Sequence, residues 1–346
     1  MKYDRFGMLE IIEALPEQCA EAAKIGSLFK LPKGFRVKYK NIVVTGLGGS
    51  AIGADIARSY TAGEIKVPFF VNRHYKLPNF VDKETLVVVS SYSGNTEETL
   101  SAYKDASARS AKIIVITSGG KLRKAANSDG VPVVHIPGGL PPRCAFMFSF
   151  FPILITLSKL GMVKDERRDI SRLISFLKGI RRTHLGRDIG IRKNTAKAIA
   201  SVLYGKFPVL YGGQDHMDSA ATRWRGQFAE NAKTLASTHL FPEMDHNEIM
   251  GWEHPKRLLK DFVAVILRDK SDHPRVSKRM DVTKKIIEKQ GVEVIEVYSM
   301  GKDLLSRIFS LIFIGDLVSY YLAMMNKVDP TPVEKIEYLK KELAKS

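Results

Sequence analysis

The sequence is poor in cysteine and lacks an apolar leader. Of its 346 residues only Cys19 and Cys144 are cysteines, too few for a disulfide framework. The first residues, Met1-Lys2-Tyr3-Asp4-Arg5, are charged where a signal peptide turns apolar. Disorder is excluded because 45% of the residues are hydrophobic, enough for a large core. We therefore expect a globular protein of the cytoplasm.

Long hydrophobic runs are also scarce. Residues 144–158 are few for a membrane span and include Pro152, and residues 308–325 carry Asp316 near their centre. We expect both runs to form buried helices, and we expect no membrane partner.

Acidic residues are in the minority. There are 54 lysines and arginines against 37 acidic residues, a net charge of +17 that suits an anionic partner. The densest basic stretch, residues 164–193, also contains acidic side chains and has no interleaved aromatics, so it indicates a solvated helical face. We expect no nucleic acid partner and favour a phosphorylated small molecule.

Short apolar runs alternate with helix-like segments in the first half. Residues 41–45 predict a strand, followed by a glycine-rich turn and a helix. Further strands are predicted at residues 67–71, 85–90, 112–117 and 131–135. Strands that are apolar on both faces and alternate with helices predict a parallel α/β sheet.

The pattern restarts in the second half. Residues 207–213 resemble the first strand and turn, and residues 262–267 and 292–297 predict further strands. We expect an α/β protein of two domains, each a parallel sheet flanked by helices. The expected boundaries are 1–160 for the N-terminal domain, 161–200 for a helical connection and 201–346 for the C-terminal domain with its closing helices at 308–325 and 333–343.

The first turn is a candidate phosphate site. Gly46, Gly48 and Gly49 allow close approach of the backbone, and Ser50 stands where a helix begins, so amide groups would face an anion. A dinucleotide site is disfavoured, because Ala51 replaces the last glycine of that fingerprint and no acidic residue ends the next strand.

A cluster of hydroxyls follows the strand at 85–90. Ser91, Ser93 and Thr96 surround the start of a helix, where they can donate to several phosphate oxygens. The alternative is that Ser93 or Asn95 merely caps that helix. Capping explains one hydroxyl and not the cluster, so we favour phosphate binding.

The second half carries the ionisable candidates. Residues 220–233 predict a helix on which Glu230 shares a stripe with small residues; the alternative is an ion pair between Glu230 and Lys233 on a solvated face. Residues 243–252 mix His246 and carboxylates with large apolar residues, which indicates a site. A zinc site from the histidines at 239, 246 and 254 is disfavoured because no zinc-binding motif occurs, so we expect no metal.

Near the C-terminus a helix with an apolar stripe begins after Asp329-Pro330-Thr331-Pro332. Lys340 falls inside this stripe, where it either snorkels to solvent or points into a ligand pocket. Lys335 lies off the stripe and is expected to face solvent.

Five segments together carry a family resemblance. They are Gly-Gly-Ser-Ala-Ile-Gly, Ser-Tyr-Ser-Gly-Asn-Thr-Glu-Glu-Thr, Glu-Asn-Ala-Lys, Asp-His-Asn-Glu-Ile-Met-Gly-Trp and Asp-Pro-Thr-Pro-Val-Glu. In order and spacing they resemble the bifunctional phosphoglucose/phosphomannose isomerases, which have two sugar isomerase (SIS) domains. The resemblance implies reversible isomerisation of glucose 6-phosphate and mannose 6-phosphate with fructose 6-phosphate, without a cofactor or metal.

The resemblance also implies roles for individual residues. Glu230 is the implied base, His246 opens the sugar ring from the neighbouring subunit of a homodimer, and Arg143 stabilises negative charge. Lys340 is implied to hold the sugar, although Lys335 stays open as the corresponding lysine, and Thr331 is a candidate for specificity. The residues implied to bind phosphate are Gly48, Gly49, Ser50, Ser91, Ser93 and Thr96. Two alternatives stay open, another SIS sugar-phosphate isomerase and a non-catalytic sugar-phosphate sensor.

Overall fold

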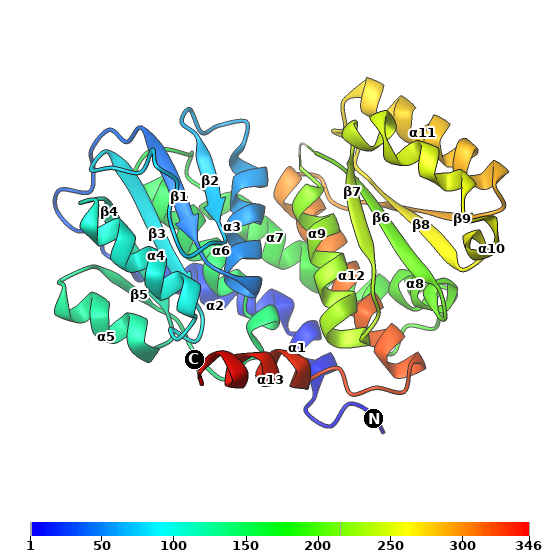
Figure 1. The fold of residues 1–346 in the computed structure, drawn as a ribbon, viewed down its shortest axis with the longest axis horizontal. Coiled ribbons are helices and arrows are strands. Elements are labelled where there is room, and N and C mark those ends of the chain that lie inside the picture. Colours follow the sequence, from blue (N-terminus) through cyan, green and yellow to red (C-terminus); the bar gives the residue numbers. More distant parts are fainter. Residues whose placement is uncertain (1, 215, 346) are drawn as a thin grey trace. The chain divides into compact units, whose positions relative to one another are not determined.

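The computed structural model describes residues 2–214 and 216–345. The chain forms two compact units, each built on its own parallel sheet (Figure 1). The first-sheet unit comprises Ala14–Lys178 and Gly301–Ile308, and the second-sheet unit comprises Met1–Glu13, Gly179–Met300 and Phe309–Ser346. The expected α/β architecture with two parallel sheets is confirmed.

The first sheet has five strands in the order β2-β1-β3-β4-β5. They are β1 (Asn41–Thr45), β2 (Phe69–Asn72), β3 (Thr85–Ser91), β4 (Lys112–Thr117) and β5 (Val133–His135). The predicted strands at 67–71 and 131–135 begin two residues later than expected. Pro68 and Pro132 have no amide hydrogen and contribute only carbonyl acceptors, so each strand starts after its proline.

The helices of this unit cover both faces of the sheet. They are α2 (Leu15–Leu28), α3 (Gly48–Thr61), α4 (Glu97–Ala108), α5 (Gly120–Ser128), α6 (Met147–Lys159) and all but the last two residues of α7 (Arg167–Ile180). From β1 the chain crosses through α3 to one side, and from β3 it crosses through α4 to the other. Right-handed crossovers therefore put α3 and α4 on opposite faces, and the loops after β1 and β3 diverge at the switch point where such sheets bind ligands.

The second sheet has the order β7-β6-β8-β9. Its strands are β6 (Phe207–Gly213), β7 (Ser237–Phe241), β8 (Phe262–Arg268) and β9 (Glu293–Tyr298), with α9 (Asp218–Gln227) leading to β7 and α11 (Pro274–Lys289) to β9. β7 does not stand out in the sequence pattern. It is an edge strand of only five residues that is buried fully at Phe241 alone, so it lacks the continuous apolar run of β6 and β8.

The remaining helices are α1 (Met8–Glu13), α8 (Thr195–Leu203), α10 (Lys256–Leu259), α12 (Leu304–Met325) and α13 (Glu334–Leu343). Within the described residues, α12 has the length and composition of a membrane span, but 83% of its apolar window is buried inside the protein. The two apolar runs are thus buried helices, α6 and α12, as expected. By contrast, α13 buries none of its side chains.

Candidate functional site

The start of α3 forms the first part of the candidate site. Gly48, Gly49 and Ser50 are its first three residues, in the turn where helix amides can face an anion. Gly48 has a φ of +51° and open space beside it, whereas a Cβ on Gly49 would lie 2.0 Å from the carbonyl oxygen of Pro142. Of these two glycines, Gly48 leaves room for a ligand. At Gly49 a side chain would clash with the backbone of Pro142, so this position needs a glycine for packing within the protein.

The loop after β3 brings two of the predicted hydroxyls together. Ser91 is buried and its Oγ lies 3.0 Å from Oγ1 of Thr96, to which it donates; it also accepts from the amide of Gly94 at 3.1 Å. Thr96 is the residue that precedes α4. Ser93 is exposed and accepts from the amide of Asn95 at 3.3 Å. Neither Ser93 nor Asn95 is the N-cap of α4, so the capping alternative is wrong.

Tyr92 connects this loop to its neighbours and was not singled out from the sequence. Its amide donates to Oγ of Ser50 at 3.2 Å, and its carbonyl accepts from Oγ of Ser118 at 2.6 Å. Its hydroxyl accepts from the amide of Leu140 at 2.9 Å. Burial raises the pKa of the Tyr92 hydroxyl, and the Leu140 amide opposes that shift. Its place inside the hydroxyl motif was the one signal in the sequence that could have pointed to Tyr92. The motif does not reveal its bonds, because the partners lie in three other segments.

Arg143 lies in a short 3₁₀ helix, Pro142–Cys144, and is buried with 4% of its surface exposed. The contact of Pro142 with Gly49 places this turn against the start of α3. Ser149 of α6 strengthens the junction, because its Oγ donates to the carbonyl of Ser50 at 2.9 Å and lies 3.0 Å from Oγ of Ser90. The structure therefore brings the Arg143 turn together with the candidate phosphate loops.

Glu230 lies at the end of the predicted helix over 220–233, which differs from expectation in its last turn. After α9 the chain forms a π-helical turn, Phe228–Ala232, and ends at Lys233 with a left-handed φ of 56°. π-Helical turns are rare and often occur at functional sites. Glu230 is half-buried in this turn.

Contacts with α12 hold α9 and the π-helical turn. Arg223 forms a buried two-point ion pair with Asp316, at 2.9 and 2.7 Å. Burial raises the pKa of Asp316, and Arg223 opposes that shift. Next to Glu230, Nδ2 of Asn231 donates to Oγ of Ser319 at 2.9 Å.

Lys233 donates its ammonium hydrogens to backbone oxygens. Nζ lies 2.6 Å from the carbonyl oxygen of Glu230, 2.7 Å from that of Pro332 and 3.5 Å from that of Pro330. The structure thus places the segment that carries Thr331 beside the turn that carries Glu230.

His246 is exposed at the end of a 3₁₀ turn that follows β7. The next residues are anchored through Glu248, which accepts from the hydroxyl of Tyr211 at 2.7 Å and lies 2.8 Å from Nδ1 of His239. Burial, followed by the Glu248 contact, raises the pKa of Tyr211. Since Glu230 precedes β7 and His246 follows it, the strand separates these two residues within one chain.

The candidate lysines, Lys335 and Lys340, are on α13. Both side chains are exposed, so exposure does not show which of them is the lysine implied to hold the sugar. The expected stripe of α13 does not pack onto a core: Ile336, Leu339 and Leu343 are between 42% and 57% exposed. The helix also begins at Glu334, five residues after Asp329.

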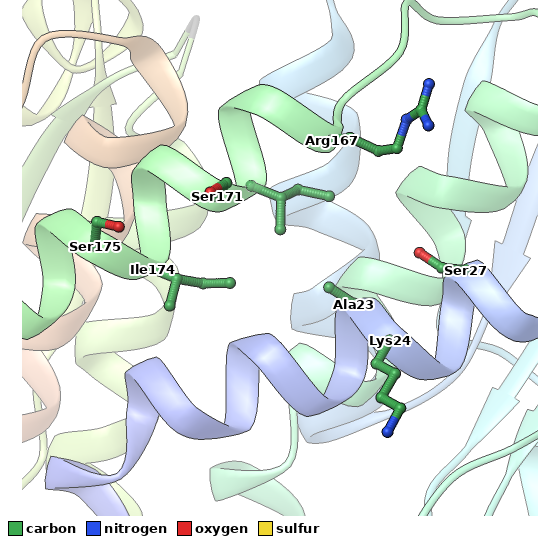
Figure 2. A pocket seen from close by; sticks show the side chains of 8 residues that line it. Ala23, Lys24, Ser27, Arg167, Ser171, Ile174 and Ser175 are labelled. Atoms are coloured by element: carbon green, nitrogen blue, oxygen red, sulfur yellow. The ribbon is translucent and has the colours of Figure 1, made fainter.

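The described residues include no group of three or more His, Cys, Asp or Glu side chains arranged to hold a metal ion. A hollow of about 270 Å³ lies elsewhere in the first-sheet unit, between α2 and α7 (Figure 2). In Figure 2 the side chains of Lys24 and Arg167 point away from its centre, and none of the candidate site residues lines it.

Comparisons with known proteins agree with these features. Residues 37–131 match the SIS domain family, and residues 192–343 match the family described as bacterial phospho-glucose isomerase C-terminal SIS domain. Among solved structures, the C-terminal domain of glucosamine-fructose-6-phosphate aminotransferase from Francisella tularensis has the same fold, with a TM-score of 0.72 and 17% identity over 94% of this chain and 98% of that one.

Two curated relatives are more similar in sequence. The bifunctional phosphoglucose/phosphomannose isomerase of Caldicellulosiruptor bescii is 45% identical over 97% of this chain and 99% of its own length. The protein of the same name from Aquifex aeolicus is 39% identical over 89% of this chain and 91% of its own. With this identity over nearly the full length, and with both SIS matches, the chain belongs to the bifunctional phosphoglucose/phosphomannose isomerase family.

Proposed function

We propose that this protein interconverts glucose 6-phosphate and mannose 6-phosphate with fructose 6-phosphate. The observation that carries the proposal is the pair of loops joined through Ser50, Ser91 and Thr96 at the starts of α3 and α4, in a chain of this family. Hydroxyl and amide donors at two helix starts suit a phosphate monoester. The substrate is a metabolite of the cytoplasm, where we expect the protein to act.

The isomerisation requires one group that moves a proton between C1 and C2. In our proposal the carboxylate of Glu230 takes the C2 proton and returns it to C1 through a cis-enediol intermediate. Arg143 stabilises the negative charge that develops on the oxygen, which lowers the energy of the transition state more than that of the neutral substrate. The burial of Arg143 supports this role, because a charge in a water-poor site interacts more strongly.

Ring opening is assigned to His246 of a second copy in a homodimer. The position of β7 supports this assignment: the strand has five residues, about 16 Å of extended chain, with Glu230 before it and His246 after it. The exposure of His246 leaves it accessible to another subunit. Lys340 holds the sugar near this histidine in our proposal, and Thr331 guides water or substrate in the mannose reaction.

Dual specificity follows from the intermediate. Glucose 6-phosphate and mannose 6-phosphate differ only at C2, and this stereocentre is lost when the C2 proton leaves. One base therefore serves both sugars, provided that rotation about C2–C3 presents either face to it. Fructose 6-phosphate should yield both aldoses.

The test is to incubate purified protein with fructose 6-phosphate and to identify the products. Glu230→Gln should reduce formation of glucose 6-phosphate and of mannose 6-phosphate in parallel, each by a factor of about 100 or more, while substrate still binds. Glu288→Gln, on α11, is the matched control. Loss of one product with survival of the other would show that two separate sites had been mistaken for one.

A further inference from the structure

We propose that Lys233 is a positioning residue for Glu230. Its ammonium group holds the π-helical turn of Glu230 to the segment Pro330–Pro332, and this connection fixes the direction of the Glu230 carboxylate. The inference rests on the proposed function, since it assumes that Glu230 is the base.

The ammonium of Lys233 joins backbone carbonyls of two segments. Its Nζ donates to the carbonyl oxygens of Glu230 and Pro332 at 2.6 and 2.7 Å and lies 3.5 Å from that of Pro330. These acceptors belong to two segments, and Pro330 and Pro332 lie 97 and 99 residues after Lys233 in the sequence. An ammonium group has three donors and no acceptor, so it can join several carbonyls at once.

The position of Lys233 in the chain explains why a connection is needed there. The α9 backbone leaves α-helical geometry at Phe228, and Lys233 itself has a left-handed φ of 56°, which side-chain-bearing residues rarely adopt. Carbonyls at the end of a helix lack intrahelical donors, and a lysine there interacts favourably with them. The ammonium of Lys233 thus stabilises the turn by donating to the carbonyl of Glu230.

The fold of the turn does not depend on Lys233 alone. Nδ2 of Asn326 donates to the carbonyl of Ala232 at 2.9 Å and to Oγ1 of Thr234 at 3.0 Å, and Asn231 bonds to Ser319. These contacts remain when the ammonium is removed. The effect of removing it should therefore appear in catalysis more than in stability.

The first test is Lys233→Met in the full-length protein, which keeps the aliphatic stem and removes the charge. We expect kcat with fructose 6-phosphate to fall about 100-fold, as a misplaced catalytic group can cause, with KM within about twofold of the wild type. Lys285→Met is the matched control, because Lys285 is an exposed lysine on α11. A lysine with a purely structural role would change the melting temperature and leave kcat of the folded fraction unchanged.

The second test restores the ammonium chemically. Lys233→Cys is treated with 2-bromoethylamine, which alkylates the thiol with loss of bromide and gives a thioether analogue of lysine. Cys19 and Cys144 are buried, so treated wild type serves as the control. We expect the untreated variant to be slow and the treated variant to recover at least half of the wild-type kcat.

The outcomes separate this inference from the function on which it rests. If the wild type does not isomerise fructose 6-phosphate, or Glu230→Gln is fully active, the proposed function fails. If Glu230→Gln is inactive but Lys233→Met has normal kcat, or aminoethylation of Lys233→Cys restores nothing, only the positioning role is overturned. If Lys233→Met does not fold, the comparison of treated with untreated Lys233→Cys still decides.

Discussion

At the residue scale, the predicted phosphate hydroxyls are not equivalent. Ser91 is buried and bonded to Thr96, whereas Ser93 is exposed and accepts from the amide of Asn95 in the same loop. Ser50 is joined to the same loop through the amide of Tyr92. Bonds within the protein therefore hold the hydroxyls of Ser50, Ser91 and Thr96 in place, and in the proposed phosphate site Ser93 would be the more adaptable donor.

Replacing Ser91 and Ser93 together by alanine should weaken substrate binding at least tenfold. Each lost bond to a charged phosphate is worth about 1.5–3 kcal/mol. A rise in KM for fructose 6-phosphate, with circular dichroism unchanged, is the expected result. Ser107→Ala, on the adjacent helix α4, is the control and should leave KM unchanged. Unchanged KM in the double variant would rule out the site assignment.

Most of the candidate residues could be identified from the sequence because they stand in short motifs. The hydroxyl cluster and the glycine turn are local patterns, and Ser91, Thr96 and Ser50 do meet in the structure. Tyr92 stands inside the hydroxyl motif, but its bonds and those of Ser149 could not be inferred from any motif, since their partners lie 26 to 99 residues away. The roles of Glu230, His246 and Lys340 stay predictions.

At the scale of secondary structure elements, the close packing of α9 on α12 supports the turn of Glu230. A Cβ on Gly315 would lie 2.1 Å from Nε1 of Trp224, and this buried indole donates to the carbonyl of Leu311 at 2.7 Å. The glycine therefore lets the two helices approach each other at the indole.

Gly315→Ala should destabilise the protein by about 1–3 kcal/mol, because the added methyl group overpacks the contact with Trp224. Gly226→Ala is the matched control on the other helix, since its Cβ would meet open space. It should be neutral or stabilise by up to about 1 kcal/mol through helix propensity. Chemical denaturation measures both; equal stability of the two variants would contradict the packing argument.

Glu166 connects the segment before α7 to α3. It accepts from the hydroxyl of Tyr60 at 2.6 Å and is buried, and burial raises its pKa while Tyr60 and Lys164 oppose the shift. A carboxyl group with a raised pKa holds its proton more tightly in the folded state. The contribution of Glu166 to stability is therefore full below the ordinary pKa of 4.5 and is lost as pH rises from that value through the raised one.

Glu166→Gln should remove this decline, because the amide oxygen still accepts from Tyr60 and no charge is buried. Melting temperatures from pH 4 to 7 should show a smaller loss for the variant than for the wild type. Asp165→Asn is the control, since Arg167 holds the pKa of this exposed carboxyl at about 2 and it stays ionised throughout. A steeper loss in Glu166→Gln would refute the argument.

Strands that are buried on both faces were the most predictable elements. β1, β3 and β4 begin at the predicted residues because each is a continuous apolar run bounded by polar residues. The edge strand β7 was not predicted because its side chains are mostly half-exposed. The π-helical turn after α9 was also unexpected, because tertiary bonds from Asn231 and Asn326 stabilise it and helix periodicity does not reveal them.

At the scale of the whole molecule, the net charge of +17 attracts a dianionic sugar phosphate. Part of the charge is neutralised locally; Arg187, for example, pairs with Glu10 at 2.7 Å and with Glu13. The rest acts at long range and is screened by salt over about 8 Å at physiological ionic strength.

The value of kcat/KM for fructose 6-phosphate should therefore fall severalfold between about 0.02 and 0.3 M sodium chloride, with little change in kcat. Initial rates at each salt concentration measure the effect, and the melting temperature at the same concentrations serves as the control for stability. A value of kcat/KM that does not depend on salt would show that the excess charge does not assist substrate binding.

The distribution of the second-sheet unit along the chain has a consequence for biosynthesis. Residues 2–13 are separated from the rest of the unit by nearly the whole first-sheet unit, and two of their ion pairs are with distant residues: Arg5 pairs with Asp329 at 2.8 Å, and Glu13 accepts from Nε of Arg187 at 2.7 Å. The ribosome synthesises residues 2–13 before their partners, and Arg187, the partner of Glu13, emerges more than 170 residues later. Residues 14–178 can collapse during translation, whereas the second-sheet unit needs both its N-terminal segment and the residues after 178. During much of synthesis this segment therefore lacks its distant partners. If the chain were cut once between the two sheets and the halves were expressed separately, α1 would be on the half that carries the first sheet, although it belongs to the second-sheet unit.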